Sequence, residues 1–221
     1  MVQQLLKYSI LICLLSGINH FAQLKDGTYQ GFAKGRTDQN HDGEISIEMR
    51  IADGRIDSIN VLKFNQSINH KKYGKYVTEV LEKLPKDLIS AQSIDVDIIT
   101  GATISSNALL LAVARAHEQA RPPIKDGIYS GSTLGRRDKN YTGEILVSVK
   151  IKESKFDSIL INSYDQSIDH RRYGESVRRA RTEIPFKIIN NQSLDVDGVS
   201  GATISSNALI LAVARALENA E

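Results

Sequence analysis

Cysteine occurs once in the 221-residue sequence, as Cys13 in an apolar run near the amino terminus. A mature chain without that run would hold neither a disulfide nor a reactive thiol, which excludes cysteine chemistry. The five histidines show no metal-ligand spacing, so no metal site is expected. Lysine and arginine (28) nearly balance aspartate and glutamate (26), and the net charge of +2 argues against nucleic acid as a partner.

The sequence also lacks an apolar run of the about 20 residues that a comfortable transmembrane helix needs. The run of residues 8–15 follows Lys7 and precedes small residues near Ala22, a pattern typical of a secretory signal peptide. We therefore expect residues 1–23 to be a signal peptide and the protein to be exported, to the periplasm or the cell surface. An uncleaved, membrane-associated anchor is the alternative. Lipidation of Cys13 is disfavoured because Ile12, directly before it, is not small.

The rest of the chain is an internal repeat. Residues 24–120 align with residues 124–220 without a gap at an offset of 100 (203 − 103), and about half of the aligned positions are identical. We expect two domains, residues 24–120 and residues 124–221, joined by the linker of residues 121–123. Its two prolines make the linker short and stiff, so that the domains and any ligands stay close together.

Each copy has the pattern of an α+β domain. Apolar and polar residues alternate over residues 43–51, which predicts a strand with one buried face. The turn residues Asp53 and Gly54 and the β-favouring residues 56–62 complete a β-hairpin. The fold class that we expect is therefore α+β, with two tandem copies of a small domain in which helices pack on an antiparallel sheet or hairpin.

Two helices are expected in each copy. Tyr73, Val77 and Leu81 recur at helical spacing, and Pro85 is expected to end this first helix. The second helix begins near Thr103, and it is apolar over residues 108–116 and therefore expected to be buried. Its first turn contains side chains that can cap free backbone N–H groups, namely Thr103, Ser105, Ser106 and Asn107.

The loop before the second helix differs least between the copies, because residues 101–109 are identical to residues 201–209. A Gly-Ala-Thr turn that leads into a helix offers backbone N–H donors, little side-chain bulk and the positive end of the helix dipole. These features suit a phosphate group. A simple helix cap is the usual role of such residues in a single occurrence, but the duplication favours a function.

The motif itself is specific. Asp97-Ile-Ile-Thr-Gly-Ala-Thr103 and Asp197-Gly-Val-Ser-Gly-Ala-Thr203 resemble the Asp-x-x-Ser/Thr-Gly-Ala-Thr flavinylation motif of the FMN-binding domain family. That family includes flavin-carrying subunits of the Nqr and Rnf membrane redox complexes. The resemblance spans most of each repeat, including the Asp-Gly-x-Tyr openings at residues 26–29 and 126–129.

This resemblance implies that two FMN groups are attached covalently, through phosphoester bonds to Thr103 and Thr203 that a flavin transferase installs. It also implies that Asp97 and Asp197 serve the modification, although a turn or capping role is the open alternative. Ile98 departs from the small residue usual in the family, so the second site, with Gly198, is the better match. The candidate cofactor-binding residues are Asp97, Thr100, Gly101, Ala102 and Thr103 in the first copy and Asp197, Ser200, Gly201, Ala202 and Thr203 in the second.

Other polar residues leave alternatives open. His70-Lys71-Lys72-Tyr73 and His170-Arg171-Arg172-Tyr173 could contact the flavin or dock an acidic redox partner, or simply form a solvated helix start. Gln66 with Ser67, and Gln92 with Ser93, could bond to the flavin ring or finish turns.

The function that we expect is that of an exported electron-transfer flavoprotein. It would relay electrons from a membrane-bound redox complex or a quinol-linked donor to an extracytoplasmic acceptor, with FMN supplying the redox chemistry. A flavin-dependent reductase and a flavin-free surface module of the same fold remain alternatives. The carrier is favoured over a stand-alone enzyme because no substrate domain accompanies the repeats, and no catalytic residue is assigned because a catalytic triad is recognised by geometry.

Overall fold

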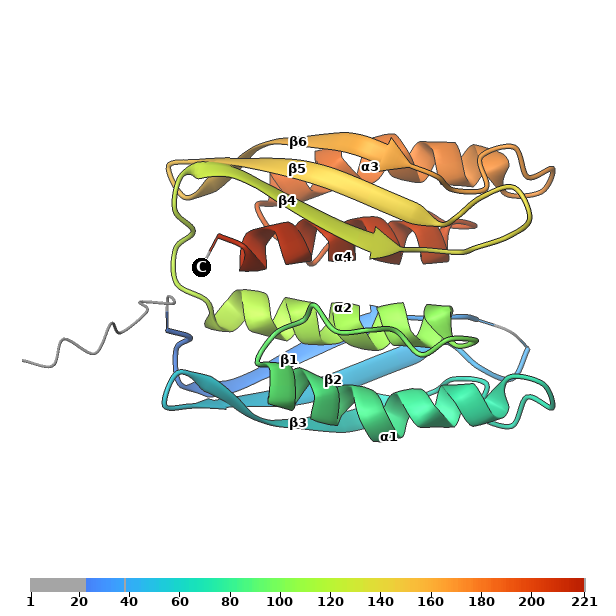
Figure 1. Cartoon of the computed structure of the whole chain (residues 1–221), viewed down its shortest axis with the longest axis horizontal. Helices are drawn as coiled ribbons and strands as arrows, with labels where there is room; N and C mark the ends of the chain where they lie inside the picture. Colours follow the sequence, from blue (N-terminus) through green and yellow to red (C-terminus); the bar gives the residue numbers. More distant parts are fainter. Residues whose placement is uncertain (1–22, 38, 221) are drawn as a thin grey trace, which may run out of the picture.

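The computed structural model describes residues 23–37 and 39–220, and it shows two copies of one α+β unit (Figure 1). The first unit comprises β1 (Gly27–Lys34), β2 (Glu44–Ala52), β3 (Arg55–Phe64), α1 (Gly74–Ala91) and α2 (Thr103–Ala120). The second comprises β4 (Gly127–Leu134), β5 (Glu144–Lys152), β6 (Lys155–Tyr164), α3 (Gly174–Asn191) and α4 (Thr203–Glu218). The predicted fold class, two tandem α+β domains with antiparallel sheets, is confirmed.

The signal-peptide prediction and Cys13 fall on residues 1–22, outside the part of the chain that the structure describes. Among the residues that it does describe, no helix has the length and hydrophobicity needed to cross a membrane.

Each sheet is an antiparallel meander in the order β1-β2-β3 or β4-β5-β6. The predicted hairpin is present, with Asp53 (φ 53°) and Gly54 (φ 70°) in the turn between β2 and β3. The Asp26 carboxylate accepts hydrogen bonds from the N–H groups of Asp53 (3.2 Å) and Gly54 (2.8 Å). The Asp-Gly-x-Tyr opening therefore ties the start of β1 to this turn.

The first helix of each unit is longer than expected. The prediction that α1 ends at Pro85 is wrong, because α1 continues to Ala91 with Pro85 inside it, and α3 likewise contains Pro185. A proline inside a helix costs about 3 kcal/mol. Leu84 and Leu88, on either side of Pro85 in sequence, are both fully buried, and each such side chain stabilises the fold by about 1.5–3 kcal/mol. Packing of this apolar face therefore offsets the lost backbone hydrogen bond.

The two units pack through their second helices. In Figure 1, α2 and α4 lie side by side in the middle of the molecule, with one sheet above them and the other below. The guanidinium group of Arg115 in α2 donates to the carbonyl oxygens of Leu194 (3.1 Å) and Val196 (2.7 Å) in the other unit. The Glu118 carboxylate accepts hydrogen bonds from the Ser193 hydroxyl and the Leu194 N–H, both at 2.9 Å.

The contacts of α4 with the first unit follow the same pattern. Arg215 donates to the carbonyl oxygen of Val96 at 3.0 Å, and the Glu218 carboxylate accepts from the Ser93 hydroxyl and the Ile94 N–H. The loop that carries each candidate motif therefore lies against the helix of the opposite unit.

Candidate functional site

Both candidate motifs lie at the same end of the molecule. Helix α2 runs antiparallel to β1, because Arg115 donates to the Phe32 carbonyl (2.7 Å) and the Lys25 N–H donates to the Ala120 carbonyl (2.8 Å). The start of α2 therefore lies where β1 ends. There the Asn107 amide donates across the units to the carbonyl of Leu134, the last residue of β4, at 2.8 Å.

The start of α4 lies beside it. Arg215 and Asn219 donate to the carbonyls of Ser132 and Ser130 along β4, and the Asn207 amide donates to the Lys34 carbonyl of the first unit at 2.7 Å. We call this end of the molecule, at the right in Figure 1, the pole. It comprises the starts of α2 and α4 and the described loop residues 35–37, 39–43, 65–73, 135–143 and 165–173.

The glycine of each motif is required by the geometry of the loop. Gly101 and Gly201 have φ values of +90° and +81°, a region that favours glycine. A Cβ atom on Gly101 would lie 2.9 Å from Cδ2 of Tyr76, and one on Gly201 would lie 2.8 Å from Oγ of Ser176. The loop therefore passes close to the first helix of its own unit, with no room for a larger residue.

The expected capping side chains do not cap the helix. The N-cap position of α2 is Ala102, with no side-chain hydrogen bond, and Ala202 has the same position in α4. Ser105 and Ser106 instead point inward, where buried polar groups require partners. The Ser105 hydroxyl donates to Oε1 of Gln66 (2.9 Å), and Oγ of Ser106 accepts from the Ile99 N–H (3.1 Å).

The second unit repeats this arrangement. Ser205 donates to Gln166 at 3.0 Å, and Ser206 accepts from the Val199 N–H at 3.0 Å. Sequence analysis missed this role of the glutamines, each of which also donates to a backbone carbonyl at 2.6 Å. Because they are buried and bonded within the protein, they fasten the helix start rather than face a ligand.

The first turn of α2 therefore has backbone N–H groups that no side chain caps. The Ser106 N–H is the first of α2 to bond to a carbonyl of the preceding loop, that of Ala102 (2.9 Å). Among the described residues, the N–H groups of Thr103, Ile104 and Ser105 have no acceptor. Free N–H groups at a helix start, together with the helix dipole, suit an anion such as a phosphate. The residues present therefore fit a phosphate-bearing cofactor.

The candidate residues lie together around this helix start. Thr103 is the first residue of α2 and Thr203 the first of α4, and both are half-buried. Ala102 and Ala202 are buried beside them. The remaining candidates are exposed to solvent, namely Asp97, Thr100 and Gly101 in the first unit and Asp197, Ser200 and Gly201 in the second.

The carboxylates of the two aspartates interact with the protein only through charge, Asp97 with Arg215 and Asp197 with Arg115, among the described residues. Among the described residues, neither the Asp97 nor the Asp197 carboxylate accepts a hydrogen bond, so the structure gives no support to the turn or capping alternative. Ile98, the departure from the motif, is half-buried and packs against the core. Gly198, at the equivalent position, is exposed, and a Cβ atom there would lie 3.2 Å from Cβ of Ser206.

Gln92 and Ser93 lie away from the pole. Gln92 exchanges two hydrogen bonds of 2.8 Å with the backbone of Ile56, and Ser93 contacts Glu218. Of the alternatives left open by the sequence, the structure supports the finishing of turns for this pair.

The second unit also has a cleft that the sequence did not reveal, because two loops far apart in the chain form it. Its volume is about 350 Å³, within the range of about 300–1,000 Å³ typical of small-molecule sites. The lining residues are Asp138, Asn140, Tyr141, Ser167, Asp169 and His170. Ser167 is next in sequence to Gln166, which holds Ser205, so the cleft lies beside the start of α4.

Hydrogen bonds order the cleft. The Asp138 carboxylate accepts from the Asn140 N–H (2.9 Å) and the Ser167 hydroxyl (2.7 Å), and these bonds hold its pKa below the usual value. The Tyr141 hydroxyl donates to Asp169 at 2.8 Å, which raises the pKa of Tyr141. At neutral pH the cleft thus combines the ionised Asp138 carboxylate with the protonated Tyr141 phenol.

Two small α+β domains, each with a helix start shaped for a phosphate, define a tandem cofactor-binding protein. The FMN-binding domain family matches residues 40–118 and 140–218, which is more than half of the chain. The chain belongs to this family, in two tandem copies, and FMN is the cofactor that the match supports.

Relatives and solved structures share parts of the chain. Over 101 residues it is 32% identical to an uncharacterised protein of Treponema pallidum (strain Nichols), covering 46% of this chain and 25% of that protein. Over 122 residues it is 29% identical to the NADH:acrylate oxidoreductase of Vibrio harveyi, covering 55% of this chain and 11% of that enzyme. The crystal structure of the CPE2226 protein from Clostridium perfringens is 30% identical, with a TM-score of 0.33, over 44% of this chain and 88% of that one. The chain thus spans at most a quarter of the two curated relatives.

Proposed function

We propose that this protein is an exported electron-transfer flavoprotein that carries two FMN groups, linked through their phosphates to Thr103 and Thr203. In this role it relays electrons from a membrane-bound redox complex or a quinol-linked donor to an extracytoplasmic acceptor. The observation that carries the proposal is the duplicated Gly-Ala-Thr helix start, which lacks a side-chain cap in both units. A protein that needed only the fold would have no reason to keep two such identical helix starts.

The chemistry of the helix start supports attachment at the threonine. A phosphodiester to Thr103 retains one negative charge, which the helix dipole stabilises by about 0.3–1 kcal/mol near the surface. The N–H groups of Ile104 and Ser105 are available as donors, and Gly101 adds no side-chain bulk beside the phosphate. FMN supplies the redox chemistry when bound, while the chain tethers and orients it.

The flavin transferase must reach the threonine hydroxyl. Thr103 and Thr203 are half-buried, but the exposed residues Gly101 and Gly201 leave the approach open on the loop side. Asp97 and Asp197, exposed and without an internal hydrogen-bond donor among the described residues, are available to serve the transfer reaction.

A carrier is favoured over a stand-alone reductase. The Vibrio harveyi enzyme is named for NADH and acrylate, but this chain matches only 11% of its length. The shared portion supports a redox role for the flavin, and the rest of that enzyme has no counterpart in the match.

Intact-mass spectrometry tests the proposal directly. The protein is co-expressed with a flavin transferase, exported and compared with Thr103→Ala, Thr203→Ala and the double variant. We expect two FMN additions in the wild type, one in each single variant and none in the double variant. Thr78→Ala in α1, which removes a hydroxyl bonded to the Gly74 carbonyl, is the matched control and should keep both additions. An unmodified wild type, in the presence of an active transferase, would support the flavin-free surface module instead.

A further inference from the structure

We infer that the pole is a docking surface for a redox protein with an acidic face, and that such a partner meets both FMN sites at once. This inference rests on the proposed function for its redox step, whereas the docking itself does not require the flavin. Four observations support it, concerning the cations of the pole, its carboxylates, the position of the two threonines and the point at which the described chain begins.

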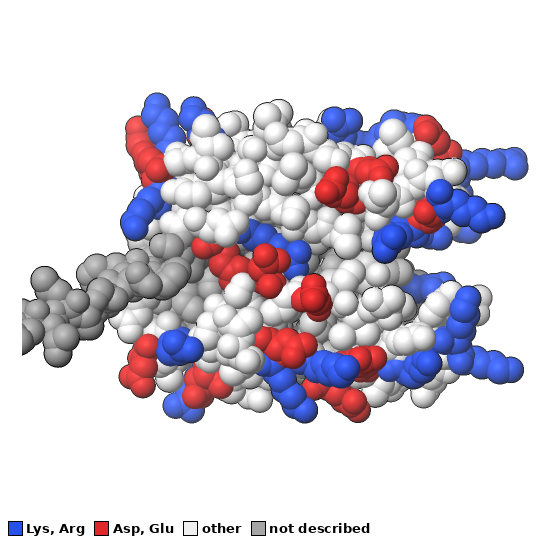
Figure 2. All heavy atoms as spheres, viewed as in Figure 1, with Lys and Arg blue, Asp and Glu red and all other residues white. Residues whose placement is uncertain are grey.

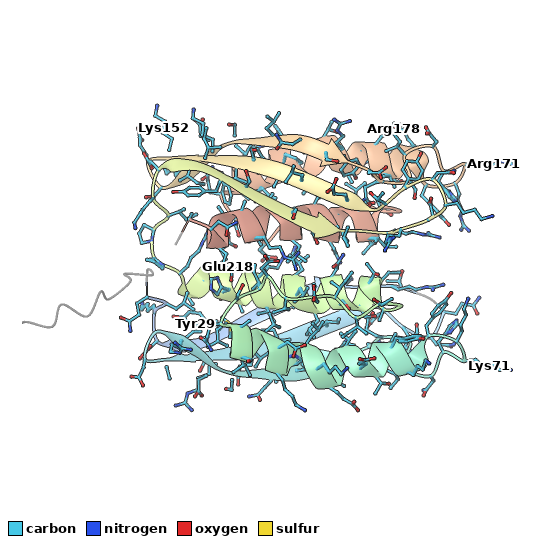
Figure 3. The ribbon with its side chains drawn as sticks, viewed as in Figure 1. Tyr29, Lys71, Lys152, Arg171, Arg178 and Glu218 are labelled. Carbon is cyan, nitrogen blue, oxygen red and sulfur yellow. The ribbon has the colours of Figure 1, made fainter. Side chains whose placement is uncertain are left out.

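The pole carries exposed cations from both units. They follow β1 and β4 or precede α1 and α3, and they are Arg36, Lys71, Lys72, Arg136, Arg137, Lys139, Arg171 and Arg172. Blue side chains gather at the right-hand end of the molecule in Figure 2, and Lys71 and Arg171 project outward at that end in Figure 3. The described residues of these loops carry four carboxylates against the eight cations, a net charge of +4 (8 − 4), whereas the whole chain has a net charge of +2, so this end is more basic than the rest.

The cations of the pole lack the internal bonds that its carboxylates make. Within the described chain, none of the eight forms an ion pair. The carboxylates of the pole, in contrast, are bonded internally. Asp42 pairs with Lys63 at 3.2 Å, Asp165 accepts from the Thr142 hydroxyl and Asp169 accepts from Tyr141. The cations therefore remain available to an external anionic surface, while the acids hold loops together.

Both proposed FMN attachment sites, Thr103 and Thr203, lie at this basic end of the molecule. The Asn107 and Asn207 hydrogen bonds across the units fix the starts of α2 and α4 side by side at the pole. A partner that docks there would approach Thr103 and Thr203 together. An excess of charge of one sign around a redox site raises association rates with partners of the opposite charge by about 10- to 1,000-fold, and this gain falls as salt is added.

The arrangement favours a protein over an anionic bilayer as the partner. Gln23, the first described residue, donates to the Asp53 carbonyl (3.2 Å) at the β2–β3 turn, which lies at the end opposite the pole (Figure 1). The described chain therefore starts at the end away from the pole. In addition, Asp138 and Asp169 lie among the cations. A surface with charges of both signs complements a protein partner, which also carries both signs, better than the uniformly negative surface of an anionic bilayer.

Stopped-flow kinetics with protein probes of opposite charge test the inference. Reduced flavodoxin, an acidic protein, donates electrons to the FMN-loaded protein, and in a second series the reduced FMN-loaded protein donates to ferricytochrome c, a basic protein. The pole variant is Lys71→Glu/Arg171→Glu. The matched control is Lys152→Glu/Lys155→Glu at the β5–β6 turn, which also reverses two exposed charges (Figure 3 labels Lys152).

We expect the pole variant to slow the flavodoxin reaction about tenfold or more at low ionic strength, to accelerate the cytochrome c reaction, and to lose both effects at high salt. The control should change neither rate by more than about twofold at about 0.1 M salt, where the Debye length is about 10 Å, because its charges lie at the far end of β5 and β6 from the pole. Equal effects of the pole and control variants would overturn the inference. So would pole-dependent binding to phosphatidylserine vesicles without any effect on the flavodoxin rate, which would assign the pole to a bilayer.

The docking can be measured without flavin. The Thr103→Ala/Thr203→Ala protein should bind oxidised flavodoxin with the same salt dependence as the wild type in biolayer interferometry. An unmodified wild-type mass with intact, pole-dependent binding would refute the proposed function and leave the docking surface. A doubly flavinylated protein whose binding and rates ignore the pole charges would refute the docking surface alone.

Discussion

The Ser105 hydroxyl donates a hydrogen bond of 2.9 Å to Oε1 of Gln66, and Ser205 makes the same bond to Gln166 at 3.0 Å. Each glutamine also donates to a backbone carbonyl of the loop that precedes the second strand, that of Gly43 or Gly143. One buried side chain thus joins the start of the second helix to two loops of the pole, while the N–H groups of the first helical turn stay free.

Replacing this glutamine should destabilise the protein without touching the proposed attachment site. Gln66→Ala leaves the buried Ser105 hydroxyl and the Gly43 carbonyl without their partner, at a cost of about 1–3 kcal/mol in the free energy of unfolding. Urea denaturation checks this value. Gln39→Ala, which removes an exposed glutamine from the loop that contains Gly43, should change the free energy of unfolding by less than about 0.5 kcal/mol. Equal stability of both variants would show that the buried bond has no net effect.

A side chain at Gly101 should disturb the motif loop. Gly101→Ala places a Cβ 2.9 Å from the Tyr76 ring at a positive φ, and the strained backbone alone costs about 1–2 kcal/mol. We expect lower stability and loss of FMN from Thr103, with Thr203 still modified, as measured by the masses of proteolytic peptides.

A second substitution should partly rescue this variant. Adding Tyr76→Ala should remove the ring contact but not the backbone strain, so that stability is only partly restored. Full flavinylation of the Gly101→Ala protein would contradict the need for glycine in this loop.

The interface arginine should be critical for stability. Arg115→Met removes the donors that Arg115 supplies to the carbonyls of Leu194, Val196 and Phe32, and unpaired buried carbonyls should cost roughly 3 kcal/mol. Thermal unfolding provides the measurement. Arg50→Met breaks an exposed ion pair with Asp57 at 3.6 Å and should cost no more than about 1 kcal/mol. Similar losses in the two variants would mean that the interface bonds contribute little.

A buried histidine should make stability depend on pH. His117 is 6% exposed beside Glu118, Arg121 and Glu218 at the α2–α4 contact, and burial lowers its pKa from 6.5 to about 4. The unfolded chain therefore binds this proton more readily than the folded one. The contribution of the neutral His117 side chain to the free energy of unfolding is fully present above pH 6.5. It decreases by up to about 3 kcal/mol as the pH falls towards 4.

His117→Leu, the residue found at the equivalent position 217, should remove this loss. Burial raises the pKa of Glu118 and of Glu218, and these groups give the opposite trend, in which stability is lost as the pH rises through their folded-state pKa values. The difference between wild type and variant isolates the histidine. Melting temperatures between pH 7 and pH 4.5 should diverge, with the wild type lower at acid pH, and parallel curves would refute the assignment.

The sequence predicted those parts of the fold that depend on residues close together in the chain. Asp53 and Gly54 have the positive φ values that a two-residue hairpin turn needs, and the alternation of β2 matches its buried face. Strand β1 was missed because Gly31 interrupts its pattern. Gly31 serves a long-range contact, since a Cβ there would lie 1.8 Å from the Ala112 carbonyl of α2. The continuation of α1 past Pro85 likewise depends on the packing of Leu88, which only the folded chain supplies.

The position of the motif at a helix start was predicted from the sequence, but the contacts of its side chains were not. The sequence placed Thr103 at a helix start, but it could not show that Ser105 and Ser106 turn inward, because the side chains that cap a helix are also those that bond inside a protein. The cleft of the second unit was beyond sequence reasoning, since Asp138 and Asp169 meet only through tertiary structure.

The reciprocal contacts of Arg115 and Arg215 have a wider consequence. Each helix holds the motif loop of the opposite unit through equivalent bonds, so the contact surface is self-complementary in the way that a twofold homodimer interface is. The tandem chain therefore resembles a homodimer in which a short linker joins the two subunits. A single unit on its own would expose the apolar side of α2 or α4. Formation of a homodimer would bury that side again.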